Sequence, residues 1–290
     1  MRGATCWHGD RLPGSRDGSG LYPLRMPAHE MALPGGNVGG AVRVGDTVRR
    51  ATGPWTPAVH ALLRHLESAG FNAAPRVLGI DDRGREILTY VEGETVGDDD
   101  PWPDWWRDDD TLVQAIVLLR RFHEAVATFE PPPDVRWRLA GSGGAAATIV
   151  HGDWAPYNVV WRGGTVVGII DWDLARPGDP LDDLAFAAWL WAPLHHPEML
   201  ARGEFGPWED AERERRLRLV VDSYGLEDRA GFMERIVARM HASADGIAHG
   251  AAAGDEGMIR LRSLGVIDDV RRSAGWADAH VGRLAEVLTG

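Results

Sequence analysis

The segment from residue 148 to residue 173 carries the side chains with the clearest capacity for chemistry. It reads TIVHGDWAPYNVVWRGGTVVGIIDWD, so Asn158 follows Asp153 by five positions and Asp171 comes after two short apolar runs. Phosphoryl transfer requires a carboxylate that can orient and deprotonate a hydroxyl, together with oxygen ligands for Mg²⁺. The residue types and their spacing therefore indicate a phosphoryl-transfer site.

The elements around these residues must bring them together. Residues 149–150 form the end of an apolar run that leads into the first Asp, and residues 159–161 and 166–170 are β-type runs around an Arg-Gly-Gly turn. Two such runs joined by a short glycine turn predict a β-hairpin. A hairpin of this size places Asp153, Asn158 and Asp171 at one end of a lobe.

The motif HGDWAPYN, followed by GIIDWDLARPGDPLDDLA, resembles the aminoglycoside phosphotransferase and choline kinase-like family, which is related to the protein kinases. The resemblance extends over about residues 34–290 and is strongest at 148–190. It implies that Asp153 is the catalytic base and that Asn158 and Asp171 bind Mg²⁺, while the choice between ATP and GTP as the phosphate donor stays open. The spacing from Asp to Asn also matches that of the kinase catalytic loop.

Other polar residues of the segment have structural interpretations. We expect His151 to hold the loop by a hydrogen bond to backbone near Asp171. Asp173 is either a second metal contact or a polar turn residue. Asp179 and Asp183 begin a helix, where carboxylates complement the helix dipole. The resemblance implies that Asp183 braces the catalytic loop.

The phosphate-binding end is predicted near residues 34–50. PGGNVGG resembles a glycine loop that covers phosphates, and the runs around Gly45-Asp46 predict a hairpin. The family's lysine position is matched by Arg49, and Arg50 is the alternative. Arginine can hold phosphates through paired hydrogen bonds, so either residue could replace lysine. Glu67 is the only carboxylate between residues 51 and 70 and hence the candidate partner.

A hinge is predicted near residues 89–92, where Tyr90 and Val91 would offer backbone groups to adenine. It closes a β-rich nucleotide-binding lobe, residues 31–95, that contains a helix opened by Thr56 as the N-cap. Residues 96–290 form a larger catalytic and substrate-binding lobe, and residues 1–30 read as a disordered leader. Helical periodicity in the larger lobe appears at 112–126, 209–223, 228–249, 257–272 and 276–288. The fold class is therefore α+β, in a two-lobed protein kinase-like arrangement.

Charge and composition narrow the partners. The chain has 43 acidic and 31 basic residues, all of the latter arginine, and its formal net charge is −12. This balance argues against nucleic-acid or membrane-surface binding and favours a cationic ligand. No run of eighteen apolar residues is present, and a single cysteine, Cys6, is typical of a reducing cytoplasm. Trp102, Trp105 and Trp106, in an acidic segment, are expected to be buried anchors rather than a cation-binding wall.

These observations predict an ATP- and Mg²⁺-dependent transfer of the γ-phosphate to a hydroxyl of a small molecule, such as an aminoglycoside or another cationic acceptor. The alternative is a kinase-like pseudoenzyme that binds a nucleotide or a protein without turnover, suggested by arginine in place of lysine. A protein kinase is disfavoured because the chain runs directly from IIDWD into DPLDDLA. No sequence feature indicates an oligomeric state.

Overall fold

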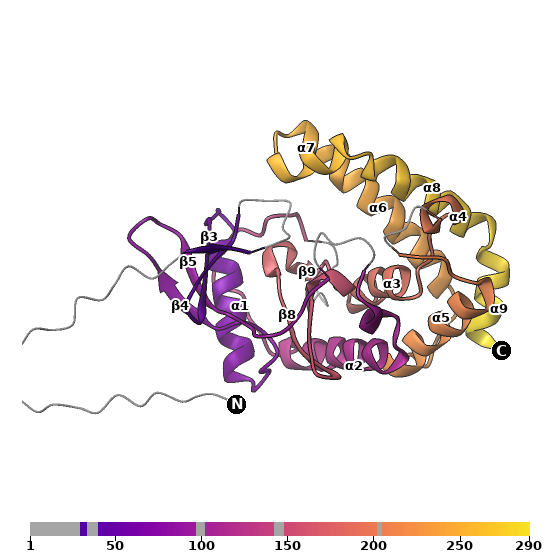
Figure 1. Ribbon diagram of the computed structural model, residues 1–290, viewed down its shortest axis with the longest axis horizontal. Helices are drawn as coiled ribbons and strands as arrows, with labels where there is room; N and C mark the ends of the chain where they lie inside the picture. Colours follow the sequence, from indigo (N-terminus) through magenta and orange to yellow (C-terminus); the bar gives the residue numbers. More distant parts are fainter. Residues whose placement is uncertain (1–29, 34–39, 97–101, 142–147, 202–204) are drawn as a thin grey trace, which may run out of the picture.

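The computed structural model describes residues 30–33, 40–96, 102–141, 148–201 and 205–290. The predicted leader lies almost entirely outside these residues, as do positions 34–39 of the glycine-rich segment. Within the described parts, a β-sheet lobe occupies one end of the molecule and a helical lobe the other (Figure 1). This is the mixed α+β, two-lobed architecture that the sequence predicts.

The smaller lobe is a five-stranded antiparallel sheet in the order β1-β2-β3-β5-β4. Its strands are β1 Met31–Ala32, β2 Val42–Val44, β3 Thr47–Arg50, β4 Val77–Ile80 and β5 Glu86–Thr89. Gly45 turns the β2–β3 hairpin at φ +60°, a conformation that glycine adopts at no steric cost. The register of β3 against β5 sets Arg50 opposite Glu86 and Thr47 opposite Thr89. The predicted hairpin and the two following strands are thus present.

Helix α1, Thr56–Ser68, buries its apolar face in the core. Its N-cap is Trp55, not Thr56 as predicted. The Thr56 hydroxyl accepts a hydrogen bond from the N–H of Gly53 at 2.9 Å, so it stabilises the turn before the helix instead of capping the first turn. Gly70, at φ +77°, follows the helix end.

The larger lobe joins two small sheets to a set of helices. Strand β6, Thr148–Val150, pairs with β9, Arg176–Gly178, and β7, Val159–Arg162, pairs with β8, Thr165–Ile169. The helices are α2 Asp109–Val126, α3 Pro180–Trp191, α4 Pro197–Leu200, α5 Asp210–Tyr224, α6 Phe232–Ala252, α7 Glu256–Ser263, α8 Val266–Ala279 and α9 Val281–Thr289. Short 3₁₀ turns lie at Asp104–Arg107, Pro156–Asn158 and Trp172–Leu174.

Two predicted helices are divided in the structure. The periodic stretch 276–288 covers the end of α8 and most of α9, which are separated at His280. The periodic stretch 257–272 covers nearly all of α7 and the first half of α8, which are separated at Gly265. Gly265 has φ +81°, a left-handed conformation that cannot continue an α-helix. The apolar periodicity continues across the break, so the sequence pattern alone did not reveal it.

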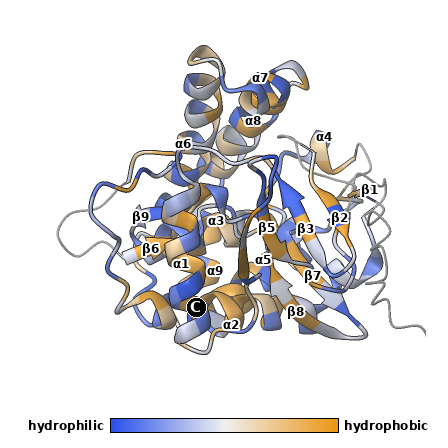
Figure 2. Cartoon of the chain, turned by 90° about the vertical axis from the view of Figure 1, so that its left-hand side faces the viewer, coloured by the Kyte–Doolittle hydropathy of each residue, from blue (hydrophilic) through white to orange (hydrophobic). Residues whose placement is uncertain are grey.

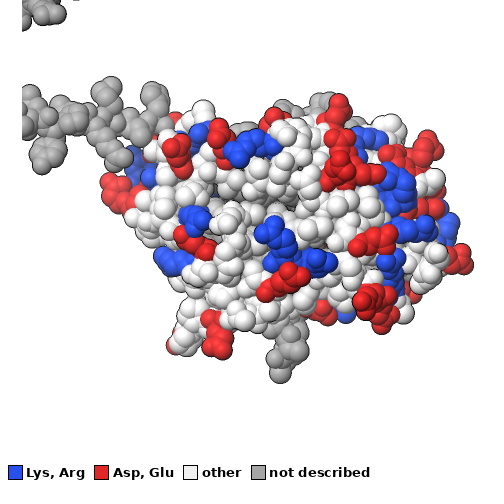
Figure 3. Space-filling view, turned by 90° about the horizontal axis from the view of Figure 1, so that it is seen from below, with Lys and Arg blue, Asp and Glu red and all other residues white. Residues whose placement is uncertain are grey.

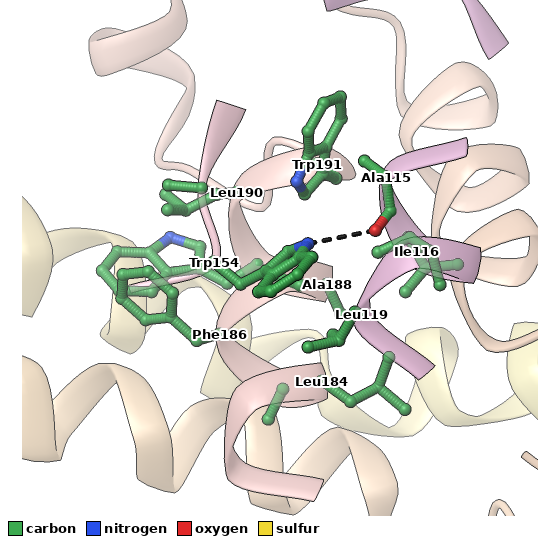
Figure 4. Close-up of a cluster of buried hydrophobic side chains, with 14 of the residues drawn as sticks. Ala115, Ile116, Leu119, Trp154, Leu184, Phe186, Ala188, Leu190 and Trp191 are labelled. Atoms are coloured by element: carbon green, nitrogen blue, oxygen red, sulfur yellow. Dashed lines mark hydrogen bonds between the residues drawn. The ribbon is translucent and has the colours of Figure 1, made fainter. Parts of the chain in front are cut away.

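The main core runs through both lobes and includes buried side chains of α1, α2, α3, α5 and α6. Figure 4 shows the part of it where α2, α3 and the loop after β6 meet. Trp154 is completely buried, and its indole N–H donates to the Ala115 carbonyl at 3.0 Å. A smaller cluster contains Trp105 and Trp106, which are 6% and 1% exposed, so the predicted role of these two as buried anchors is confirmed. The colouring of Figure 2 shows apolar segments in the interior strands and helices of both lobes.

Charges on the surface are mixed in sign. Arginines and carboxylates lie side by side over the face shown in Figure 3. Many surface arginines of the described residues form ion pairs, such as Arg215 with Asp109. Among the described helices, none combines the length and the apolar character needed to cross a membrane.

Candidate active site

The loop after β6 is held by a buried carboxylate on α3. Asp183 accepts hydrogen bonds from the backbone N–H groups of His151 at 2.6 Å and Gly152 at 2.7 Å. Burial alone would raise the pKa of Asp183, but the hydrogen bond from His123 and these backbone donors outweigh it and lower the pKa. Asp183 is therefore a charged brace for the loop, in agreement with its predicted position.

Gly152 is required by the shape of this loop. Its φ is +83°, and a Cβ atom there would lie 2.6 Å from the Leu174 carbonyl oxygen. His151 is fully buried, and its Nε2–H donates to the Ile170 carbonyl at 3.2 Å. Burial lowers the pKa of His151 and keeps the ring neutral. The predicted tie between His151 and the backbone beside Asp171 is thus present.

The structure brings Asp153 and Asn158 together. The Tyr157 hydroxyl donates to Asp153 Oδ1 at 2.8 Å, and Asn158 Nδ2 donates to Oδ2 at 2.8 Å and to the Asp153 carbonyl at 2.9 Å. Burial and the nearby Asp171 raise the pKa of Asp153 to about 6, against the opposing effect of the two hydrogen bonds. The amide nitrogen of Asn158 therefore fixes the Asp153 carboxylate. The amide oxygen of Asn158 takes no part in these hydrogen bonds.

Asp171 reaches the same place from the end of β8. The Ile170 N–H donates to the Asn158 carbonyl at 2.9 Å, which ties the two segments together. Asp171 itself has φ +61°, an uncommon left-handed conformation for a residue with a side chain. Its side chain is 48% exposed, so its carboxylate faces open space beside Asp153. The three predicted residues thus converge as the hairpin predicted.

The arginine that faces this site is Arg50, and the placement predicted for Arg49 is corrected. Arg50 Nη1 lies 3.2 Å from Asp171, its Nη2 lies 2.6 Å from Asp173, and its Nε donates to Glu86. Adjacent side chains on a strand point to opposite faces. Arg49 consequently turns away and lies near Asp81, at 3.8 Å.

The acidic partner of the arginine also differs from the prediction. Glu67 pairs with Arg76 at the surface and takes no part in the site. The buried partner of Arg50 is Glu86 on β5, which is 2% exposed and also contacts His60 Nε2 of α1 at 2.8 Å. Sequence analysis missed Glu86, although pairing of residues 47–50 with 86–89 would have placed it opposite Arg50.

Asp173 lies in the 3₁₀ turn Trp172–Leu174, which agrees with a polar turn residue, one of its two predicted roles. It forms ion pairs with Arg50 at 2.6 Å and with Arg138 at 3.5 Å, so it anchors two arginines. Tyr90 and Val91 do lie at the junction of the lobes. The Tyr90 N–H donates to the Asp46 carbonyl at 2.9 Å, and the guanidinium of Arg43 stacks 3.8 Å above the Tyr90 ring.

A cleft of about 1960 Å³ separates the lobes and contains these groups. Its smaller-lobe side includes Val48, Arg50, Leu88, Tyr90 and Val91. Its floor includes Asp153, Asn158 and Asp171, and its far side is formed by α3, α6, α7 and α8. This volume exceeds that of a typical single small-molecule site, which measures about 300–1,000 Å³.

The oxygen donors on the floor fit a magnesium ion. No group of three or more His, Cys, Asp or Glu side chains that could hold a metal occurs within the described ranges. Mg²⁺ in phosphoryl-transfer sites is usually bound by one or two carboxylates and by substrate phosphates, so a three-residue protein cage is not needed. The Asp171 carboxylate and the Asn158 amide oxygen have the hard-donor character that this ion prefers.

Comparison with known proteins agrees with this geometry. A model of the phosphotransferase enzyme family (APH) matches residues 134–206, which include the catalytic segment. The trifolitoxin immunity protein of Rhizobium leguminosarum bv. trifolii is 39% identical over 215 residues, covering 72% of this chain and 79% of that protein.

Solved structures share the fold. A choline/ethanolamine kinase family protein from Mesorhizobium loti is 17% identical with a TM-score of 0.51, over 93% of this chain and 95% of its own. A microcompartment-associated aminopropanol kinase is 13% identical with a TM-score of 0.58, over 91% and 95%. The GDP and kanamycin complex of APH(2″)-IIIa is 15% identical with a TM-score of 0.54, over 86% and 95%. With its family match, its relative and its two-lobed fold, this chain belongs to the phosphotransferase enzyme family.

Proposed function

We propose that this protein is a small-molecule kinase that transfers the γ-phosphate of ATP to a hydroxyl group in the presence of Mg²⁺. The observation that carries the proposal is the convergence of Asp153, Asn158 and Asp171 on one wall of the interlobe cleft. Family membership supports it, because the matched family model covers this same segment.

Each residue of the convergence has a chemical task in this proposal. Asp153 orients the acceptor hydroxyl and receives its proton as the acceptor oxygen bonds to the γ-phosphorus and the bond to the bridging oxygen breaks, releasing ADP. A pKa near 6 leaves the carboxylate mostly ionised at neutral pH and still basic enough to take a proton. Asn158 and Asp171 would hold Mg²⁺, which when bound neutralises charge on the phosphates.

Arg50, not Arg49, would steady the phosphates in this proposal. Its guanidinium already lies against Asp171 and is fixed by the buried Glu86, so it is positioned at the metal-binding end of the cleft. Tyr90 and Val91 line the cleft where adenine would bind, and the Tyr90 carbonyl is the group that could accept from its amino group.

The acceptor is proposed to be a bioactive small molecule. The relative is named for immunity to trifolitoxin, and a solved structure of the same fold contains kanamycin. Phosphorylation of a hydroxyl adds charge and bulk, which would abolish recognition of a toxic compound by its target. An aminoglycoside or another cationic acceptor, favoured by the net charge of −12, is included among the candidates to be tested.

The test is ADP release from ATP–Mg²⁺ in the presence of amino sugars, amino alcohols and nucleosides, with Asp153→Ala beside the parent protein. Loss of the general base should reduce turnover by about 10²–10⁴-fold, with nucleotide binding retained. Asn158→Ala should raise the Mg²⁺ concentration needed for half-maximal activity. Equal background turnover in the parent and Asp153→Ala would contradict the proposal.

A second candidate function is nucleotide binding without turnover. It is favoured by one observation: Arg50 bridges Asp171 and Asp173, so an arginine occupies both carboxylates at the metal-binding end. In that case the parent would bind ATP, and no acceptor in the panel would accelerate ADP release.

A further inference from the structure

Five arginines line the interlobe cleft in the described part of the chain, and they divide into two groups. Arg50, Arg138 and Arg235 each pair with at least two carboxylates. For Arg176 and Arg239, no carboxylate of the described residues lies within ion-pair distance. In a protein with 43 acidic residues, two unpaired arginines in one cleft require an explanation.

Arg239 lies next to the proposed catalytic base. It projects from α6, and its Nη2 donates to the Gly152 carbonyl at 3.0 Å, one residue before Asp153. Its Nη1 donates to the Ser243 hydroxyl, and its guanidinium lies 4.5 Å from the centre of the Phe186 ring. These contacts fix the group in place without neutralising its charge.

Arg176 approaches the same glycine from β9. Its Nη1 donates to the Leu174 carbonyl at 2.8 Å. The same Nη1 lies so close to Gly152 that a Cβ atom on this glycine would be 2.3 Å from it. Two guanidinium groups therefore meet over Gly152. Burial, and then the positive charge of Arg176, lower the pKa of Arg239 to about 10, against a weaker opposing effect of nearby carboxylates. These carboxylates, none of which lies within ion-pair distance of Arg239, are those of Asp183, Asp153 and Asp182.

Paired cations of this kind are suited to an anion. Each guanidinium carries five N–H donors, and the hydrogen bonds above use only one from Arg176 and two from Arg239. A partly buried charge without a counter-ion is costly, and a carboxylate or phosphate bound by both groups would remove that cost. An ammonium group at the same place would meet two like charges instead.

We propose that the phosphate acceptor carries an anionic group, a carboxylate or a phosphate, which Arg176 and Arg239 bind while its hydroxyl lies at Asp153. The proposal rests on the proposed function for the reaction, but the recognition of charge is independent of turnover.

The experiment measures binding of three sugars of one scaffold that differ in charge: D-glucuronate, D-glucuronamide and D-glucosamine. Calorimetry with Mg²⁺ and a non-hydrolysable ATP analogue should rank the carboxylate first, the neutral amide second and the ammonium last. Glucose 6-phosphate, in a fourth arm, separates a preference for phosphate from one for carboxylate. The preference for glucuronate over glucosamine should be about 10-fold or more, from charge-assisted hydrogen bonds.

Variants locate that preference. Arg176→Gln and Arg239→Gln should each weaken glucuronate binding about 10-fold, with glucuronamide binding unchanged. Arg235→Gln is the matched control, since Arg235 lines the same cleft from the same helix but pairs with Asp179 and Asp182. If Arg239→Gln disturbs the loop, Arg176→Gln still tests the proposal, because Arg176 donates to the Leu174 carbonyl and not to Gly152.

The outcomes separate this inference from the proposed function. Equal or undetectable binding of the three sugars overturns it, as does preferred binding of glucosamine. It is also overturned if the two Gln variants weaken the ATP analogue and leave glucuronate unaffected, because the arginines would then serve the nucleotide. Charge-selective binding without phosphorylation would count against the proposed function and leave the anion site standing.

Discussion

The adjacent residues Arg49 and Arg50 offer the sharpest test of how the smaller lobe works. Both are arginines on β3, and their side chains lie on opposite faces of the sheet. We expect Arg50→Met to reduce both stability and nucleotide binding, and Arg49→Met to do neither to a comparable extent. The pair controls for strand position, side-chain type and loss of one positive charge.

The magnitudes follow from what each substitution leaves behind. When Arg50 is removed, Glu86, which is 2% exposed, keeps only its contact with His60 among the described side chains. Asp173 keeps its ion pair with Arg138. Breaking a buried ion pair from one side costs about 3–5 kcal/mol. Removing Arg49 leaves Asp81 with its hydrogen bonds from Arg85, so the cost should be about 1 kcal/mol or less.

Thermal unfolding and nucleotide titration provide the readouts. For a chain of this size 1 kcal/mol corresponds to about 2–4 °C, so Arg50→Met should lower Tm by about 6–20 °C. Loss of a charge-assisted contact to phosphate should weaken ATP–Mg²⁺ binding about 10- to 100-fold. Arg49→Met should lower Tm by no more than about 4 °C and change nucleotide affinity less than about 3-fold.

A double variant tests whether Glu86 is the reason for the instability. In Arg50→Met/Glu86→Gln the uncompensated buried charge is gone, so part of the lost stability should return. Nucleotide binding should stay weak, because it depends on the guanidinium. The reasoning is refuted if Arg49→Met is the variant that loses nucleotide binding, or if the double variant is less stable than Arg50→Met by the full cost of a second independent loss.

Two further predictions concern buried groups of the larger lobe. Asp183→Ala should lower the free energy of unfolding by about 3 kcal/mol and reduce turnover, because two backbone N–H groups of the catalytic loop lose their acceptor. An unchanged Tm and activity would show that Asp183 does not brace the loop. Burial, and then the positive charge of Arg213, lower the pKa of His195 to about 3. The neutral His195 side chain therefore contributes its full stability above about pH 6.5, the pKa in the unfolded chain. This stability is lost as the pH falls towards 3, by up to about 1.36 kcal/mol per pH unit. Between pH 7 and pH 5 the parent should therefore lose about 2 kcal/mol more in denaturant unfolding than His195→Phe, and equal losses in the two proteins would contradict this.

Local patterns in the sequence accounted for a large part of the fold. The glycine turn at Gly45, the alternation of Val42 and Val44 with polar residues, and the helical spacing of 112–126 correspond to β2, β3 and α2. These predictions succeeded because turn geometry and side-chain periodicity are properties of short segments. The division at Gly265 was missed because apolar periodicity continues on both sides of it.

The catalytic segment was likewise readable from the sequence. Asp153, Asn158 and Asp171 are connected by one loop and one hairpin, so their proximity follows from chain length and strand pairing. The bond from Asn158 to Asp153 spans five residues and needs no long-range information.

Only the tertiary structure decided what faces these residues. In the β2–β3 hairpin Arg49 lies opposite Val42, so the two share one face of the sheet. The hairpin alone does not determine which face of the sheet lines the cleft. That is set by packing of the sheet against the larger lobe, which turns Arg50 inward and brings Glu86 beside it. Arg239, 86 residues after Asp153 in the sequence, reaches the catalytic loop only because α6 packs on α3. The sequence thus determined the reacting groups, and the packing of distant elements determined the charges around them, because electrostatic contacts depend on distance in space and not along the chain.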